Sequence, residues 1–79
     1  MNLKISLYGT LSRRVPGYKH SQGMEVDLPD GATVNDLLIL LGILDSQKAA
    51  VAIDGRIRKA KDKIPSGARV RVFQPVHGG

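Results

Sequence analysis

The chain has 79 residues, which is enough for one domain with a modest core and leaves no room for a second domain. It contains no cysteine, so disulfides, a thiolate zinc site and a cysteine nucleophile are excluded, and any sulfur chemistry must take its thiol from another protein. Twelve Lys and Arg against seven Asp and Glu give a formal net charge of +5, which fits a nucleic-acid partner or an acidic docking surface. No apolar stretch approaches a membrane span and residues 1–9 lack a signal-peptide pattern, so we expect a cytoplasmic protein without a membrane partner.

The N-terminal third predicts two strands joined by a long loop. Apolar and polar residues alternate over residues 2–8, which is the period of a half-buried strand. Residues 9–23 contain Pro16-Gly17 and no sustained period, so we expect an irregular surface loop there. A second alternating stretch follows at residues 24–28 and ends at the turn residues 29–31.

The next segment predicts one amphipathic helix. Thr33 is suited to cap its first turn, and Asp36 stands three residues on, in the capping-box position. Gly42 is the residue type that most easily adopts the left-handed conformation that ends a helix. The apolar face between these two ends consists of Val34, Leu37, Leu38 and Leu41.

The second half predicts further short strands. Residues 50–53 lead through the tight-turn pair Asp54-Gly55 into residues 56–58, which indicates a hairpin. The turn Pro65-Ser66-Gly67 then precedes a last alternating strand over residues 69–73. The order is close to ββαβββ, which predicts an α+β domain with one main helix packed across a mixed sheet of four to five strands. We expect the first and last strands to be neighbours in that sheet.

Basic residues gather late in the chain, and only Asp62 opposes them there. They are Arg56, Arg58, Lys59, Lys61, Lys63, Arg69 and Arg71. A basic RNA-binding module is one interpretation, but single-stranded RNA stacks on aromatic side chains and the chain has few of them. Docking to an acidic enzyme is the interpretation that we favour, and we expect no nucleic-acid partner.

Strand alternation places Phe73 on the same face as Arg69 and Arg71, opposite the face that turns toward the core. An aromatic ring exposed there is suited to anchor a protein partner. The competing interpretation is that the ring folds over the edge of the sheet and covers the core. We expect these three residues to form the partner-docking surface.

Residues 74–79 lie beyond the last strand pattern, and we expect them to form a flexible tail after a domain of residues 1–73. The tail ends in Pro75, Val76, His77, Gly78 and Gly79. Two glycines fit a frayed end, but they also let a backbone enter a narrow channel and leave the terminal carboxylate open to attack. Reaction of that carboxylate with ATP would give an acyl adenylate, which a sulfur or amine nucleophile can open inside a partner enzyme.

The whole pattern resembles a known family. Its parts, in chain order, are the N-terminal strand, Val26-Asp27-Leu28-Pro29, Gly31-Ala32-Thr33-Val34, Asp36-Leu37-Leu38, Ile53-Asp54-Gly55, Pro65-Ser66-Gly67 and the Gly78-Gly79 end. Together and in this order they are similar to the ubiquitin-like sulfur carriers of molybdopterin and thiamine biosynthesis, the MoaD/ThiS family. The resemblance covers nearly the whole chain and implies a β-grasp (ubiquitin-like) fold.

The resemblance also implies a carrier that is not itself an enzyme and binds no cofactor. In this family a ubiquitin-activating-type enzyme uses ATP to adenylate the C-terminal glycine, which then becomes a thiocarboxylate. Gly79 matches that glycine, Gly78 matches the second glycine, and Phe73 matches a tail-proximal residue that contacts partners. The implied partners are the adenylating enzyme, a sulfur donor protein and a synthase such as the molybdopterin synthase large subunit.

The end of the chain resembles two different branches of the family. Phe73-Gln74 is similar to the thiamine carriers and Pro75-Val76 to the molybdopterin carriers, while His77 departs from the small residue common at its position. We expect the molybdopterin pathway, with the thiamine thiazole pathway as an alternative. A second alternative is protein modification, in which Gly79 would be joined to a lysine amine of another protein.

Overall fold

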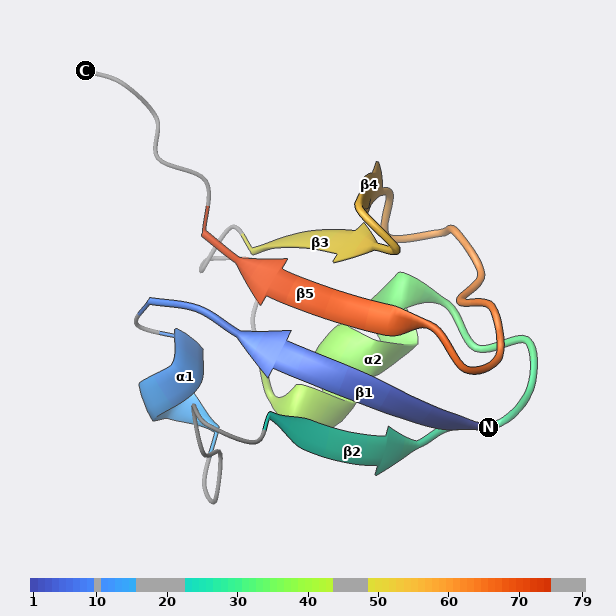
Figure 1. The fold of residues 1–79 in the computed structure, drawn as a ribbon, viewed down its shortest axis with the longest axis horizontal. Coiled ribbons are helices and arrows are strands. Elements are labelled where there is room, and N and C mark those ends of the chain that lie inside the picture. The colour runs from blue at the N-terminus through green and yellow to red at the C-terminus, as the bar shows by residue number, and fades with distance from the viewer. Residues whose placement is uncertain (10, 16–22, 44–48, 75–79) are drawn as a thin grey trace.

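A computed structural model describes residues 1–9, 11–15, 23–43 and 49–74 of the chain. Its elements are β1 (Asn2–Leu7), α1 (Leu11–Arg14), β2 (Met24–Asp27), α2 (Val34–Leu41), β3 (Ala50–Ile53), β4 (Arg56–Arg58) and β5 (Arg69–Phe73). In the described residues, five strands form one sheet in the order β2-β1-β5-β3-β4, and α2 crosses one of its faces (Figure 1). The predicted α+β class, with one main helix across a mixed sheet, is therefore confirmed.

The pairing of the strands makes β5 the middle strand of the sheet. β5 runs parallel to β1, with Ile5 opposite Val70, and antiparallel to β3, with Val51 opposite Val72. The β1–β2 and β3–β4 pairs are antiparallel. The expectation that the first and last strands are neighbours is confirmed.

The structure corrects the prediction of an irregular loop over residues 9–23. Residues 11–14 form α1, and Leu11 and Val15 are both buried in the core. These two residues are four apart, so a single helical turn directs both toward the same side. The Ser12 hydroxyl donates to the carbonyl of Gly9 at 2.8 Å and holds the start of this turn. Four helical residues are too few to produce a visible period in the sequence, and residues 16–22 lie outside the described residues.

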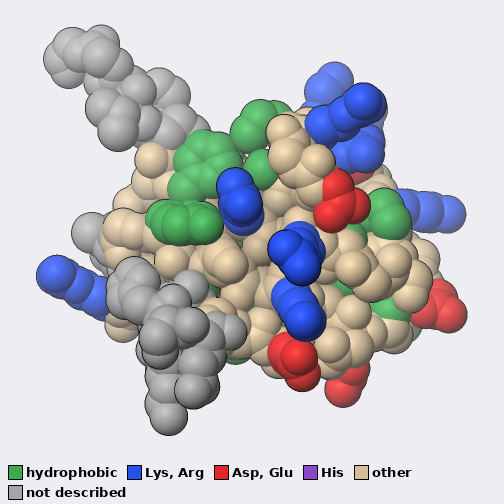
Figure 2. Space-filling view, in the orientation of Figure 1, with side chains coloured by type: hydrophobic (Ala, Val, Ile, Leu, Met, Phe, Trp, Pro, Cys, Tyr) green, Lys and Arg blue, Asp and Glu red, His purple; other side chains and the backbone are tan. Residues whose placement is uncertain are grey.

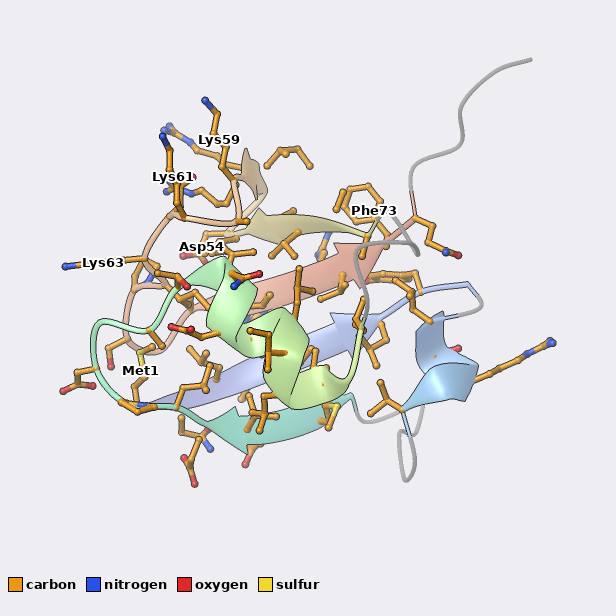
Figure 3. The ribbon with its side chains drawn as sticks, turned by 180° about the vertical axis from the view of Figure 1, so that it is seen from behind. Met1, Asp54, Lys59, Lys61, Lys63 and Phe73 are labelled. Atoms are coloured by element: carbon orange, nitrogen blue, oxygen red, sulfur yellow. The ribbon has the colours of Figure 1, made fainter. Side chains whose placement is uncertain are left out.

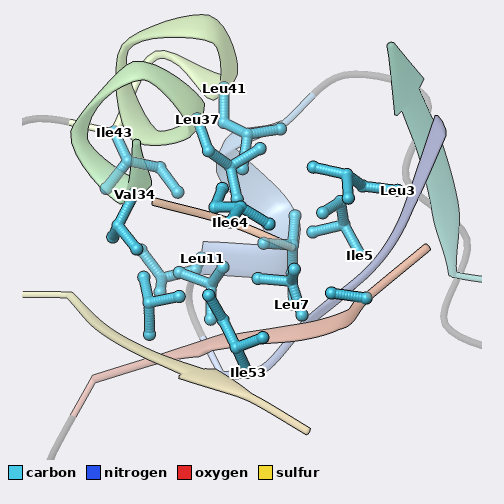
Figure 4. Close-up of a cluster of buried hydrophobic side chains, with 14 of the residues drawn as sticks. Leu3, Ile5, Leu7, Leu11, Val34, Leu37, Leu41, Ile43, Ile53 and Ile64 are labelled. Atoms are coloured by element: carbon cyan, nitrogen blue, oxygen red, sulfur yellow. The ribbon is translucent and has the colours of Figure 1, made fainter. Parts of the chain in front are cut away.

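The hydrophobic core lies between the sheet and α2 (Figure 4). Inward-facing residues of β1, β3 and β5 meet one face of α2, and α1 and the segment before β5 close the ends. Its main members are Leu3, Ile5, Leu7, Leu11, Val34, Leu37, Leu41, Val51, Ile53, Ile64, Val70 and Val72. Burial of each such side chain is worth about 1.5–3 kcal/mol, so this layer fixes the sheet against the helix.

Both predicted ends of α2 are confirmed. The backbone N–H of Asp36 donates to Thr33 Oγ1 at 3.2 Å, and the Thr33 N–H donates to Asp36 Oδ2 at 2.9 Å, which completes the capping box. Gly42 ends the helix with a φ of 74°, a conformation that costs a glycine little. Among the described residues, no helix has both the length and the apolar content needed to cross a membrane.

The predicted β3–β4 hairpin is also confirmed. Its two turn residues have positive φ values, 50° for Asp54 and 86° for Gly55, as the tight two-residue turn between right-twisted strands requires. The turn is tied to β5, because the Asp54 N–H donates to the carbonyl of Arg69 at 3.1 Å and Asp54 Oδ1 accepts from the Arg69 N–H at 3.2 Å. The turn of the hairpin therefore lies beside the start of β5.

Candidate docking site

The strand that leads to the predicted tail, β5, is held by backbone pairing on both sides almost to its end. Phe73 lies opposite Ala50 of β3, and on the other side the Tyr8 N–H donates to the carbonyl of Val72 at 3.1 Å. Backbone pairing on both sides fixes the direction in which the chain leaves the sheet. Gln74 is the last described residue, so the tail residues Pro75, Val76, His77, Gly78 and Gly79 lie outside the described residues.

The sheet face opposite α2 carries the predicted docking residues, and we call it the open face. Along β5 the exposed Arg69 and Arg71 alternate with the buried Val70 and Val72. Figure 2 looks onto this face, where basic side chains line the middle and hydrophobic side chains gather toward one end. The predicted orientation of Arg69, Arg71 and Phe73 is therefore confirmed, while their role in docking stays a prediction.

Phe73 is neither fully exposed nor part of the core. Its side chain is half-buried, and it does not belong to the core cluster or to the residues packed against that cluster. Tyr8 follows the Leu7 that pairs with Val72, so the two aromatic residues take neighbouring positions on the open face. Tyr8 is 44% exposed, and with Phe73 it gives the end of β5 an aromatic surface suited to anchor a partner.

A shallow hollow of about 280 Å³ lies on the open face beside these aromatics. Its lining is polar and cationic and consists of Lys4, Ser6, Tyr8, Arg69, Val70 and Arg71. Among the described residues, no carboxylate forms an ion pair with its three cationic side chains. The hollow can therefore accept a carboxylate or another anionic group, and the guanidinium groups can bind it in two-pronged geometry.

Sequence reasoning missed three contributors to this hollow, Lys4, Ser6 and Tyr8. They stand on the polar side of the first strand, and the parallel register places Lys4 opposite Arg69 and Ser6 opposite Arg71. The signal was available, because the predicted neighbourhood of the first and last strands brings their polar sides together. Alternation read one strand at a time does not reveal such a shared surface.

The predicted basic cluster divides into two groups in space. Arg69 and Arg71 lie on the open face, whereas residues 56–63 carry the other basic side chains on β4 and the segment after it. Figure 3 shows Lys59, Lys61 and Lys63 at one end of the molecule and Phe73 toward the other. Within the described residues no group of His, Cys, Asp and Glu could hold a metal ion.

Comparison with known proteins gives three findings. A family model described as the ThiS family matches residues 7–79. No protein with a curated description matches the sequence. Similar solved structures are SAMP1, the small archaeal modifier protein 1 of Haloferax volcanii (TM-score 0.72, 20% identity, 100% of both chains covered), and molybdopterin converting factor subunit 1 of Pyrococcus furiosus (TM-score 0.75, 21% identity, 96% and 99% covered).

A second structure of the H. volcanii protein has a TM-score of 0.71 at 19% identity and covers 95% of this chain and 98% of the other. At such low identity these likenesses establish the fold. They confirm the expected β-grasp, ubiquitin-like architecture.

Proposed function

The chain belongs to the ThiS family, and from this premise we propose that it is a sulfur carrier whose Gly79 carboxylate is adenylated and then converted to a thiocarboxylate. The observation that carries the proposal is the position of β5. This strand is the middle strand of the sheet, is paired to β1 as far as Val72 and to β3 as far as Phe73, and leads directly to the predicted tail. A fixed exit lets a partner that binds the open face also receive the tail in a defined direction.

The open face supports docking of the adenylating partner. It offers aromatic side chains for anchorage at the end of β5 and a cationic hollow for an acidic group of the partner. We propose that Phe73, Arg69 and Arg71 make this contact while residues 75–79 enter the partner's active site. ATP is bound by that partner, and the chain contributes position and the carboxylate.

The chemistry follows from the terminal carboxylate. One of its oxygens attacks the α-phosphorus of ATP, pyrophosphate leaves, and the resulting acyl adenylate is a far better electrophile than the carboxylate. Sulfide released by a donor protein would displace AMP and give the thiocarboxylate directly. If the nucleophile is a persulfide on the donor, its attack expels AMP and leaves an acyl disulfide, and a second thiol of the partner then releases the thiocarboxylate while forming a disulfide with the donor. Gly78 and Gly79 have no side chain to obstruct either step, and the partner supplies the acid, base and charge stabilisation.

We propose that the carrier works in the cytoplasm. There it would serve as the small subunit of an enzyme of the molybdopterin synthase type. The similar structure from P. furiosus is described as a molybdopterin converting factor subunit, and this description supports the pathway. The structural similarity itself concerns only the fold. The thiamine thiazole pathway and protein modification are the alternatives, and the second has a counterpart in the description of the H. volcanii protein. Intact-mass analysis of protein from its native source separates them in part, because a thiocarboxylate exchanges one oxygen for sulfur whereas conjugation adds a whole protein.

One observation favours a test of the RNA alternative. Neighbouring Tyr8 and Phe73, beside Arg69 and Arg71 on an open sheet face, form an arrangement on which unpaired bases can stack. Fluorescence anisotropy with a labelled uridine oligomer at physiological ionic strength measures this directly. Saturable binding that Phe73→Ala removes would favour the RNA module over the carrier.

The proposal predicts that adenylation requires Gly79 as the last residue. Deletion of Gly79, or addition of one residue after it, should abolish ATP–pyrophosphate exchange with the cognate adenylating enzyme, because the reacting carboxylate is displaced from the active site. The fold should stay intact, since the core cluster ends at Val72. Circular dichroism and thermal melting of both variants serve as the control. Exchange at wild-type rates by both variants would contradict the carrier function.

A further inference from the structure

A second group of basic side chains lies on β4 and on the turn that follows it. We call it the basic edge surface, and it consists of Arg56, Arg58, Lys59, Lys61 and Lys63, all of which are exposed. Figure 3, seen from the side of α2, shows the three lysines at one end of the molecule and Phe73 toward the other. The proposed carrier chemistry uses none of these basic residues.

The register of the sheet directs the two arginines, Arg56 and Arg58, to the side of α2. Their partners across the β3–β4 pair are Ile53 and Val51, which belong to the core between the sheet and the helix. Ile57 stands between the arginines and points to the opposite side, the open face, because successive side chains of a strand alternate. On the side of α2, β4 therefore presents only cations.

The lysines stand on a turn that Asp62 and α2 hold in place. The Lys59 N–H donates to Asp62 Oδ2 at 2.8 Å, and the Lys59 carbonyl accepts from the Asp62 N–H at 3.0 Å. The N–H groups of Val34 and Asn35, in the first turn of α2, donate to the carbonyls of Asp62 and Ala60 at 2.9 and 2.8 Å. The backbone of the turn is therefore fixed before a partner binds, which lowers the entropy cost of association.

The charge of this surface is not neutralised from within. Among the described residues, no carboxylate forms an ion pair with any of the five cations. Asp62 is the one acidic residue within residues 56–63, so this stretch has a net charge of +4, from five cations and one carboxylate. That carboxylate accepts from the Lys59 backbone. The positive charge is therefore available to an anion from outside.

Protection of the sheet edge explains only part of this charge. Charged residues on an edge strand often serve to prevent pairing between copies. Arg56 and Arg58 can do this, because β4 is an edge strand of the sheet. The three lysines follow β4 and belong to none of the five strands. Edge protection does not account for them.

The composition of the surface favours nucleic-acid phosphates over an acidic protein. Protein interfaces have an apolar centre, but here Ile57 faces the other side and the turn offers only the small Ala60. Contacts to phosphates need cations alone. Alternate residues of a strand, such as Arg56 and Arg58, lie about 7 Å apart, which is close to the separation of successive phosphates along a nucleic-acid strand. Residues 56–63 contain no aromatic residue on which an unpaired base could stack, so a duplex fits better than a single strand.

We propose that the basic edge surface binds the phosphate backbone of a double-stranded nucleic acid without reading its sequence. Because the arginines point away from the open face, the chain can hold the nucleic acid while a protein partner engages its tail. This contact is independent of the proposed sulfur chemistry. The sequence-based expectation of no nucleic-acid partner considered stacking on aromatic residues, which contact with phosphates does not need.

The test is fluorescence anisotropy of the full-length protein with two labelled duplexes of unrelated sequence, measured over a series of salt concentrations. The variant is Arg56→Gln/Arg58→Gln. The matched control is Arg69→Gln/Arg71→Gln, which removes the same charge from the open face. A glutamate peptide with as many negative charges as the duplex is the third probe, and circular dichroism checks the fold of both variants.

We expect the wild type to bind both duplexes equally, with log affinity falling linearly against log salt concentration. Arg56→Gln/Arg58→Gln should bind at least about tenfold more weakly at physiological salt and reduce the salt slope by about two, because two phosphate contacts are lost. The control should keep nearly the wild-type slope. ATP–pyrophosphate exchange should be the same in Arg56→Gln/Arg58→Gln as in the wild type, whatever the fate of the carrier proposal.

Other results would overturn the inference. Equal loss of duplex affinity in the two double variants would attribute the binding to net charge. Tighter binding of the glutamate peptide than of the duplexes would assign the surface to an acidic protein, and a marked preference for one duplex would contradict contact through phosphates alone. Absence of saturable duplex binding would remove nucleic acid as the partner. Loss of pyrophosphate exchange in Arg56→Gln/Arg58→Gln, with duplex binding retained, would place the adenylating enzyme on this surface instead.

Discussion

Val72 and Phe73 are adjacent in the sequence but belong to different environments. Val72 is fully buried against α2, whereas the ring of Phe73 lies half-buried on the open face and outside the core cluster. The pleat of the strand causes this difference, because successive side chains point to opposite faces. The two residues therefore allow packing and docking to be tested one position apart.

Phe73→Ala should weaken binding of the adenylating enzyme by more than about 1 kcal/mol, because it removes an aromatic anchor next to the exit of the tail. Its effect on the free energy of unfolding should stay well below the roughly 3–5 kcal/mol typical of a Phe removed from a core. Calorimetric titration and chemical denaturation measure the two quantities. Val72→Ala is the control and should show the reverse, a loss of stability with affinity retained.

A drop in stability of the size expected for a core Phe would show that the ring seals the core. The partner-docking role of Phe73 would then lose its support. Unchanged affinity together with unchanged stability would remove Phe73 from both functions.

Among the elements, α2 depends on a partner far from it in sequence. Thr33 and Asp36 cap each other within the helix, but the next N–H groups, of Val34 and Asn35, are satisfied by carbonyls of residues 60 and 62. The segment after β4 therefore completes the start of the helix. This link also leaves no free N–H group there for an anion, since Asp36 donates to Thr33.

Thr33→Ala should lower the free energy of unfolding by about 1 kcal/mol, because the Asp36 N–H loses its acceptor. Thr33→Ser keeps the hydroxyl and should restore most of the stability, which chemical denaturation at equilibrium can measure. Pyrophosphate exchange should be unaffected in both variants, since the helix lies on the face opposite the docking residues. Equal stability of the Ala and Ser variants would mean that the cap contributes nothing measurable here.

At the scale of the whole molecule, eight of the twelve basic residues belong to two surfaces: Lys4, Arg69 and Arg71 line the hollow of the open face, and the other five lie within residues 56–63. Charge on an exposed surface acts mainly by steering a partner over long distances, and salt screens this effect. The two surfaces should therefore influence association with different partners, although both contribute to the same net charge.

Arg69→Glu/Arg71→Glu should slow association with the adenylating enzyme at low ionic strength, and the difference from wild type should shrink as salt is added. The melting temperature should change little, because both side chains are exposed and the hydrogen bonds between Arg69 and Asp54 use the backbone of Arg69. Stopped-flow measurements give the rates. Lys61→Glu/Lys63→Glu changes the net charge equally at the other surface and should leave this association nearly unchanged. Equal slowing by both pairs would assign the effect to net charge and not to the open face.

The sequence by itself determined the strands, the capped helix, the β3–β4 hairpin and the side to which Arg69, Arg71 and Phe73 point. These features depend on local rules, namely strand alternation, helical period and the conformations that Gly, Asp and Thr favour. The family was also readable from the order of its motifs, and the match over residues 7–79 confirms it. The roles of Gly78, Gly79 and the rest of the tail stay predictions.

Only the tertiary structure decided what lies beside what. The parallel pairing of β1 with β5 brings Lys4, Ser6 and Tyr8 to the arginines of β5 and so creates the hollow. The short helix α1 forms because burial of Leu11 and Val15 compensates for the weak intrinsic tendency of so short a segment to be helical. Four residues show no helical period in the sequence. The basic cluster divides because β3 lies between β4 and β5. Strand order and burial depend on contacts between distant parts of the chain, so a residue pattern read locally could not supply them.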